Sequence, residues 1–299
     1  MRITQNIIFD RLFNNINKNR SALAKLQDNA GTGLEVRKPS DGPARFASAR
    51  QVTEVIERSE QYQLNVSAGL RDNRMAQNAV QNMTDQLIDF KRIAIQGATA
   101  TLSENDRKAL ADEIAGIREN LVAEANTRSG NRHLFGGTNT SEPPFMIDDT
   151  ATGGVADTSN TNPVGVRISD SVSVDISVTG TALRETPAGD LFERLLDVES
   201  ALRNNEPLSV SAALDDIDVI IDHVTRQAAH VGNSINRMEF MYEKLEFNII
   251  SQSSEKSRLV DTDYMKTMSE VTKYQVAFEA ALSVNGKLLQ TSLLNYLRM

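Results

Sequence analysis

Residues 214–249 read LDDIDVIIDHVTRQAAHVGNSINRMEFMYEKLEFNI, and this stretch decides the fold class. Apolar side chains recur along it at alternating steps of three and four residues. The repeat includes Leu214, Ile217, Ile221, Val224, Ala228, Val231, Ile235, Met238, Tyr242, Leu245 and Ile249. Because a 3,4 repeat places its members on one face of a helix, it predicts a long helix in a coiled-coil-like bundle with these residues in its core.

Other segments carry the same helical signal. The 3,4 repeat continues from Val52 to Ala94 after Pro43, and predicts a second helix of about fifty residues. Ser103 is a predicted N-cap, with Asp106 three residues later as in a capping box. A shorter helix is predicted from Asp190. The chain is therefore expected to be mainly helical.

Both ends of the chain repeat this pattern. The N-terminal positions are Phe9, Leu12, Ile16, Asn19, Leu23, Leu26 and Ala30. The C-terminal positions are Met268, Val271, Gln275, Phe278, Leu282, Asn285 and Leu289, followed by Leu293, Leu294 and Tyr296. Two such ends predict amphipathic helices that need partners, although helices docked on the protein's own core are the alternative.

Residues 141–187 have a different composition, with 13 Ser or Thr, four Gly and no Lys. The segments VGVRI (164–168) and VSVDISV (172–178) alternate apolar and polar residues around SDS, which predicts a hairpin. The segment TATGGVADTSNTNP (150–163) predicts a loop. The expected fold class is therefore a long antiparallel helical bundle, mainly α, with a β-rich insert.

This pattern divides the chain into five expected parts. Residues 1–42 form an N-terminal assembly helix and turn that is disordered in the monomer, and 43–140 form the first part of a helical rod. Residues 141–187 form the insert, 188–254 the second part of the rod, and 255–299 a C-terminal assembly helix.

Composition excludes several classes of function. The chain has no cysteine and no Trp, and its net charge is −8. Residues 1–50 are basic, but the charges are spread over a helical pattern, which favours a solvated helix over nucleic-acid binding. No run approaches the ~18 apolar residues of a membrane span, so no membrane insertion is expected. The start MRITQNIIFDRL lacks the features of a cleaved signal peptide.

Catalytic chemistry is not indicated. His223 and His230 are seven residues apart on one predicted helix without a third ligand, and His133 stands apart from them. We expect solvated histidines rather than a metal site. The glycine pairs at 136–137 and 153–154 are typical of turns. We therefore expect no enzyme activity and no cofactor.

Three stretches carry a family resemblance. They are residues 1–49, which end in LAKLQDNAGTGLEVRKPSDGPARFASA (23–49), then GNRHLFGGTNTSEPPF (130–145), and GNSINRMEF (232–240) together with the tail 261–297, which ends in SLLNYL (292–297). In this order they resemble the flagellin superfamily, and in particular those members that join the flagellar hook to the filament. Only the insert is left unmatched.

The resemblance implies a structural adaptor of the bacterial flagellum, exported through the type III apparatus without a cleaved signal peptide. Its terminal helices would pair and assemble a ring with other copies. The implied partners are a neighbouring hook-associated protein, flagellin on the filament side, and a cytoplasmic export chaperone at the C-terminal region. A filament-forming flagellin is the alternative.

Overall fold

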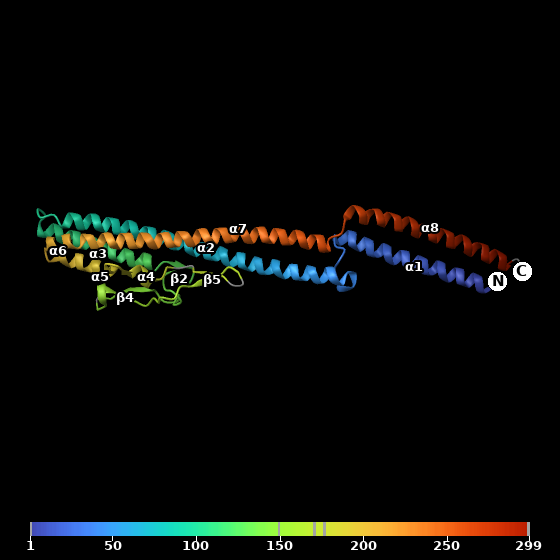
Figure 1. The fold of residues 1–299 in the computed structure, drawn as a ribbon, viewed down its shortest axis with the longest axis horizontal. Coiled ribbons are helices and arrows are strands. Elements are labelled where there is room, and N and C mark those ends of the chain that lie inside the picture. The colour runs from blue at the N-terminus through green and yellow to red at the C-terminus, as the bar shows by residue number, and fades with distance from the viewer. Residues whose placement is uncertain (1, 149, 170–171, 176–177, 298–299) are drawn as a thin grey trace. The chain divides into compact units, whose positions relative to one another are not determined.

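The computed structural model describes residues 2–148, 150–169, 172–175 and 178–297, and long helices dominate it (Figure 1). The chain forms two compact units. The first unit combines residues 1–57 with residues 248–299, and the second consists of residues 58–247. The expected fold class, mainly α with a β-rich insert, is confirmed.

The first unit is helical. It contains α1 (Arg2–Thr32), the short 3₁₀ helix η1 (Pro39–Asp41) and α8 (Tyr264–Leu297). The beginning of α2 (Pro43–Gly97) and the end of α7 (Leu214–Val260) also belong to it. Helices α1 and α8 lie side by side.

The second unit is built on α2 and α7, which run antiparallel. Lys91 Nζ lies 2.5 Å from Asp218 Oδ1, and Asn73 Nδ2 lies 3.5 Å from Met238 Sδ. Residues that come later on α2 therefore contact residues that come earlier on α7. Helices α3 (Glu104–Ala125), α5 (Leu191–Arg203) and α6 (Pro207–Ala212) pack beside them (Figure 1).

The strands of the second unit form four short antiparallel pairs. They are β1 (Arg128–Ser129) with β2 (Arg132–His133), β3 (Phe145–Ile147) with β4 (Val155–Asp157), β5 (Gly165–Arg167) with β6 (Ser173–Asp175), and β7 (Glu185–Thr186) with β8 (Gly189–Asp190). The 3₁₀ helix η2 (Thr152–Gly154) precedes β4, and α4 (Gly180–Arg184) precedes β7. The hairpin predicted around residues 169–171 is present as β5 and β6.

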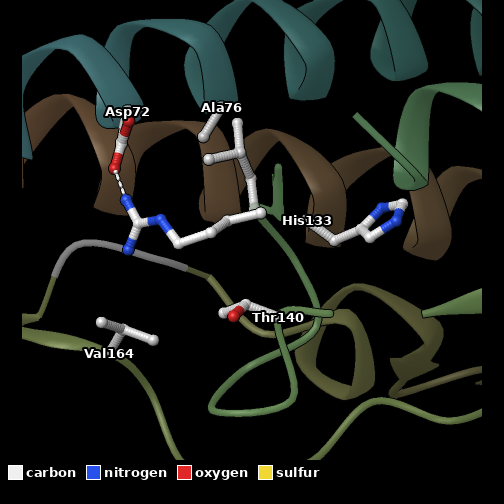
Figure 2. Close-up of a pocket in the computed structure, with 7 residues that line it drawn as sticks. Asp72, Ala76, His133, Thr140 and Val164 are labelled. Carbon is white, nitrogen blue, oxygen red and sulfur yellow. Dashed lines mark hydrogen bonds and ion pairs between the residues drawn. The ribbon is translucent and has the colours of Figure 1, made fainter. Parts of the chain in front are cut away.

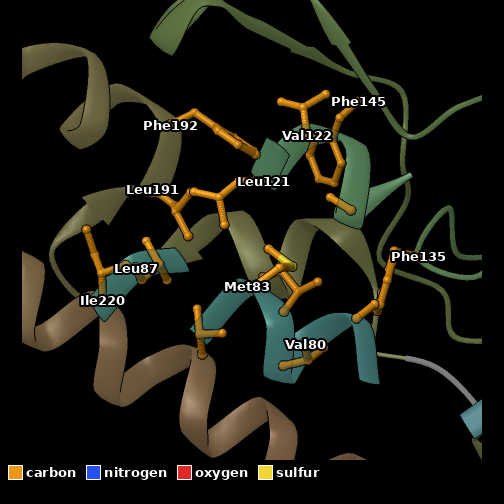
Figure 3. Close-up of a cluster of buried hydrophobic side chains, with 14 of the residues drawn as sticks. Val80, Met83, Leu87, Leu121, Val122, Phe135, Phe145, Leu191, Phe192 and Ile220 are labelled. Atoms are coloured by element: carbon orange, nitrogen blue, oxygen red, sulfur yellow. The ribbon is translucent and has the colours of Figure 1, made fainter. Parts of the chain in front are cut away.

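The hydrophobic core lies where the helices meet the insert (Figure 3). Helices α2, α3, α5 and α7 and the strand segments all contribute buried side chains. Figure 3 labels Val80, Met83, Leu87, Leu121, Val122, Phe135, Phe145, Leu191, Phe192 and Ile220. The rings of Phe145 and Phe192 pack at a centroid distance of 5.4 Å, so the insert is held on α5 by aromatic contact.

The helix caps follow the sequence signals. Ser103 is the N-cap of α3, and its Oγ accepts a hydrogen bond from the Asp106 backbone N–H at 3.2 Å. Asp190 is the N-cap of α5, and its carboxylate accepts from the backbone N–H of Phe192 at 2.9 Å. Both caps satisfy N–H groups that have no partner within the helix.

The prediction of a loop over residues 150–163 is wrong in part. Val155–Asp157 pairs with Phe145–Ile147 as strand β4. Gly153 precedes it with φ 70, and a Cβ there would lie 2.5 Å from the Glu193 backbone nitrogen. Only glycine allows both this backbone conformation and this close approach to α5.

The residues of the predicted 3,4 repeat on α7 differ in how deeply they are buried. Ile217, Val224, Val231, Ile235, Met238 and Leu245 are buried, whereas Leu214, Ile221 and Tyr242 are half-buried. Ile220 lies outside the predicted 3,4 frame and is fully buried. The early part of α7 meets several neighbours, since Asp216 pairs with Arg194 of α5 and His223 contacts the Ala182 carbonyl oxygen of α4. Its buried stripe is therefore wider than a two-helix seam.

Replacement of Val231 by Asp tests the buried seam. Val231 is 2% exposed, and an unpaired charge there costs on the order of several kcal/mol. We expect Val231→Asp to lower the melting temperature of the helical signal markedly. The matched control is Ala229→Asp, which puts the same side chain on the exposed face of the same turn. Equal melting temperatures for the two variants would contradict the packing.

Candidate assembly surfaces

A small hollow lies beside the β1–β2 hairpin (Figure 2). Asp72 on α2 accepts a hydrogen bond from Ser129 Oγ at 2.6 Å and pairs with Arg132 Nη2 at 2.5 Å, shown by the dashed line. The space enclosed is about 20 Å³, room for about one water molecule. The charged pair therefore fastens the hairpin to α2, in a space too small for a substrate.

The three histidines lie in different surroundings. His133 is buried, and its Nδ1 lies 3.0 Å from the Asn126 carbonyl oxygen. His223 is half-buried, with Nε2 2.7 Å from the Ala182 carbonyl oxygen, and His230 is exposed. Among the described residues, no group of three or more His, Cys, Asp or Glu is placed to hold a metal ion.

Two wider, open hollows lie in the second unit, one of about 350 Å³ beside Arg194 and Asp216 and one of about 310 Å³ beside Asn65 and Arg132. Along the described part of the chain, none of the helices combines the length and the apolar character needed to cross a bilayer.

The first candidate surface is the α1–α8 pair of the first unit. The predicted positions Leu12, Ile16, Leu23 and Leu26 are each half-buried on one face of α1. Since α8 is the main contact of α1, this face meets α8. The side chain of Phe9 lies outside the described residues. The predicted role of these residues in assembly stays a prediction.

On α8 the face toward α1 differs from the predicted frame. Val271 and Phe278 are half-buried, but Met268 and Leu282 are 40% and 49% exposed. At the other positions of the predicted frame, the residue one place earlier is the more buried one. These residues are Thr267, Tyr274 and Ala281. The side chains of Leu289, Leu293, Leu294 and Tyr296 lie outside the described residues.

The outer faces of this pair carry apolar side chains. On α8, Met265 is 81% exposed and Val276 is 60% exposed. On α1, Phe13 is 59% exposed. Large apolar groups left in water on both helices are typical of a surface that a further partner covers.

The turn between α1 and α2 is fixed on the end of α7, all within the first unit. The backbone N–H of Glu35 donates to the Val260 carbonyl oxygen at 2.7 Å, and Val36 packs with Ala49 and Val260. Arg45 Nε donates to the Leu259 carbonyl oxygen at 2.9 Å. The roles of Arg45 and Val260 could not be predicted from local sequence, because their contacts join residues about two hundred positions apart.

Asp41 in η1 is the charged group that stabilises this turn. Burial alone would raise the pKa of its carboxyl. Hydrogen bonds from the backbone N–H groups of Arg37 and Lys38, both at 3.3 Å, and from Lys25 Nζ at 3.2 Å act in the opposite direction and leave the pKa below the ordinary value of 3.8.

This shift predicts loss of the turn in acid. Because the folded-state pKa is lowered, the stabilising effect of Asp41 is present above the ordinary pKa and is lost as the pH falls through the folded-state value. Hydrogen exchange at the backbone N–H of Arg37 and Lys38 should therefore accelerate below about pH 4, beyond the intrinsic rate change. In Asp41→Asn, which does not titrate, the protection should not depend on pH, and the same acid transition in that variant would contradict the assignment.

Comparison with known proteins identifies the family to which the chain belongs. Residues 3–140 match the family model of the bacterial flagellin N-terminal helical region, and residues 214–297 match that of the C-terminal helical region. The chain is 24% identical over 306 residues to flagellar hook-associated protein 3 of Salmonella typhimurium, covering 94% of this chain and 95% of that protein. It is 26% identical over 294 residues to flagellin of Bacillus subtilis, covering 94% of each.

A solved structure shares the fold. The flagellar junction protein of Legionella pneumophila superimposes with a TM-score of 0.59 at 14% identity, covering 72% of this chain and 99% of that one. Both helical regions of the flagellin models are thus present, in order, in a chain with the corresponding fold. The chain belongs to the flagellin family.

Proposed function

We infer that the chain is the structural adaptor that joins the hook of the bacterial flagellum to its filament. The observation that carries this proposal is the end-to-end alignment with hook-associated protein 3, over 94% of this chain and 95% of the relative. The fold of the Legionella pneumophila junction protein supports it. An adaptor of this kind works by binding and needs no catalytic site.

The α1–α8 pair is the surface through which copies assemble into a ring. Apolar side chains remain exposed on its outer faces, as at Phe13, Met265 and Val276. Contacts between unlike faces of identical subunits generate closed rings or helical arrays. The predicted N- and C-terminal assembly residues lie on these two helices, where a neighbouring copy would cover them.

The terminal helices become ordered on assembly. No apolar side chain that the structure describes on α1 or α8 is fully buried; the buried residues there are Asn29 and Thr267. A helix pair without a dry core is marginal in water. In the free monomer, α1 and α8 are therefore expected to be largely unfolded and to fold on binding, while the turn that contains Val36 stays fixed on the end of α7.

The remaining partners follow from this role. The adaptor contacts a hook-associated protein on the hook side and flagellin on the filament side, outside the cell. A cytoplasmic chaperone holds the C-terminal region before export through the flagellar type III apparatus, without cleavage of a signal peptide. The β-rich insert faces away from the axis of the assembly.

A filament-forming flagellin is the second candidate, because the identity to the Bacillus subtilis flagellin is 26% over 94% of each chain. The two roles differ in what the purified chain does when seeded. A flagellin extends seeds into long filaments, whereas an adaptor adds a limited layer and stops. Long filaments of this chain alone would establish the second candidate.

Limited proteolysis of the dilute monomer tests the order of its ends. We expect cleavage within about residues 1–35 and 265–299 first, because unfolded segments are cut before packed ones. A fragment that contains both the strands and α7 should resist. Ends as resistant as residues 214–249 would contradict folding on assembly.

Complementation tests both the function and the assembly surface. Cells that lack this chain should build hooks, carry no filaments and release flagellin into the medium, and the unchanged chain should restore filaments. The double variant Met268→Ser/Leu282→Ser should not, because each apolar group that an interface buries contributes roughly 1.5–3 kcal/mol. Electron microscopy counts the filaments, and the amount of variant outside the cell controls for export.

The matched control is Lys273→Ser/Glu279→Ser, two exposed polar positions on the same helix. It should restore filaments as the unchanged chain does. Both double variants should melt like the unchanged monomer, because Met268 and Leu282 are 40% and 49% exposed. Normal filaments with Met268→Ser/Leu282→Ser would show that these two residues are not part of the assembly surface.

A further inference from the structure

The sequence contains a single Asn-Gly pair, Asn285–Gly286, and it lies inside α8. Asn285 comes seven residues after Phe278, which is about two turns of helix, so both lie on the face of α8 that meets α1. Asn285 is half-buried, and its Oδ1 is buried without a hydrogen-bond partner among the described residues. A change of charge at this side chain would therefore act directly on the α1–α8 contact.

Packing does not explain the glycine that follows. Gly286 is exposed, and a Cβ added to it would meet no atom within 4 Å. Its φ lies outside the left-handed region that favours glycine. Alanine would fit at this position and would strengthen the helix, since glycine is among the weakest helix formers. Gly286 therefore weakens α8 locally, and no contact within the described first unit compensates for it.

An asparagine before a glycine is chemically labile in a flexible chain. The backbone nitrogen of Gly286 attacks the side-chain carbonyl carbon of Asn285, a new C–N bond closes a succinimide ring, and the side-chain amide leaves as ammonia. Water then opens the ring and leaves aspartate or isoaspartate in place of Asn285. Glycine favours the first step because no Cβ shields its nitrogen.

Helical structure blocks this reaction. An α-helix holds ψ at about −42° and engages each backbone N–H with the carbonyl group four residues earlier. Ring closure needs a different ψ at Asn285 and a free nitrogen at Gly286, so it requires local opening of the helix. Where α8 is formed, the rate of deamidation falls in proportion to the fraction of chains that are open.

We propose that Asn285–Gly286 is a deamidation site that is open in the free monomer and closed once α8 is helical in the assembly. The proposal rests on the adaptor function, in which the terminal helices fold on assembly. The product carries a negative charge, and isoaspartate also lengthens the backbone by a carbon atom. An unpaired charge on the face that meets α1 opposes the pairing of the two helices. Chains that stay unassembled therefore lose their ability to assemble with time.

Mass spectrometry of the purified full-length chain tests the open state. The unchanged chain is incubated in mildly alkaline buffer, as a dilute monomer and in concentrated urea, and is then digested with trypsin. Residues 274–287 report on Asn285, and residues 227–237 report on Asn233, which precedes a serine in α7. At each site the rate in the monomer is divided by the rate in urea, which removes differences in intrinsic reactivity.

We expect a ratio of about 1 at Asn285 and below about 0.1 at Asn233, because α7 belongs to the packed second unit. In isolated flagella, the rate at Asn285 should be at least about tenfold lower than in the monomer. A ratio at Asn285 as low as that at Asn233 would overturn the proposal, because α8 would then be formed in the monomer. Equal rates in flagella and in the monomer would also overturn it.

Two sets of variants test the chemistry and its consequence. Gly286→Ala should slow the reaction in urea severalfold, and an unchanged rate would show that the mass change does not arise from ring closure at this pair. Asn285→Asp carries the charge of the product and should restore fewer filaments than Asn285→Ser, which removes the same amide without adding charge. Equal filament counts for the two variants would overturn the loss of assembly.

The adaptor function and the deamidation site fail in different ways. If the unchanged chain does not restore filaments to cells that lack it, the adaptor function is wrong. The rate ratio at Asn285 then still decides whether the site is open in the monomer. If the unchanged chain restores filaments and the ratio at Asn285 equals that at Asn233, the adaptor function stands and the deamidation site is wrong.

Discussion

The antiparallel packing of α2 on α7 buries a long series of mainly apolar side chains in the second unit. On α2 the series includes Val66, Val80, Met83, Leu87 and Phe90, each 1% exposed or less. The other helices and the strand segments contribute side chains to the same buried cluster. Helices α3 and α5 cover it, and Phe145 and Phe192 close it from the side of the insert. Without this contact, the short strand pairs would have no surface on which to form.

The long helices could be predicted from sequence because their signal is local and repeated. A 3,4 pattern sustained through several heptads leaves one choice of face, as along α7 from Val224 to Leu245. The 3,4 pattern predicts the buried residues less well where a helix packs against more than one neighbour. Ile220 is buried although the repeat passes from Ile217 to Ile221, because α4 and α5 join α2 around that part of α7.

The insert was less predictable because its strands are short and its contacts are distant in sequence. The β5–β6 hairpin shows strict alternation in the sequence, whereas β4 follows two glycines that are typical of a turn. His133 is buried in the β2 strand, where its ring reaches the carbonyl group of Asn126, the C-cap of α3.

The assembly surfaces show the same limit. On α1 the described positions of the predicted frame all lie on the half-buried face, although Phe13 is exposed on the outer face. Helix α8 is apolar on two faces, with Phe278 toward α1 and Val276 away from it, and the choice between adjacent frames then depends on the partner. The hydrogen bond from Arg45 to the Leu259 carbonyl oxygen could not be predicted from local sequence, because it joins residues 214 positions apart.

Asn73 gives the α2–α7 contact a property that apolar packing alone lacks. It is 1% exposed, its Nδ2 donates to the Met238 sulfur, and its Oδ1 meets no hydrogen-bond partner among the described residues. A polar group buried at such a cost is tolerated in one register and penalised further in others. A slip of one heptad would shift one helix past the other by about 10 Å. In the proposed ring, every subunit would carry the same internal register of α2 on α7, so the length of this helix pair would be the same in each copy.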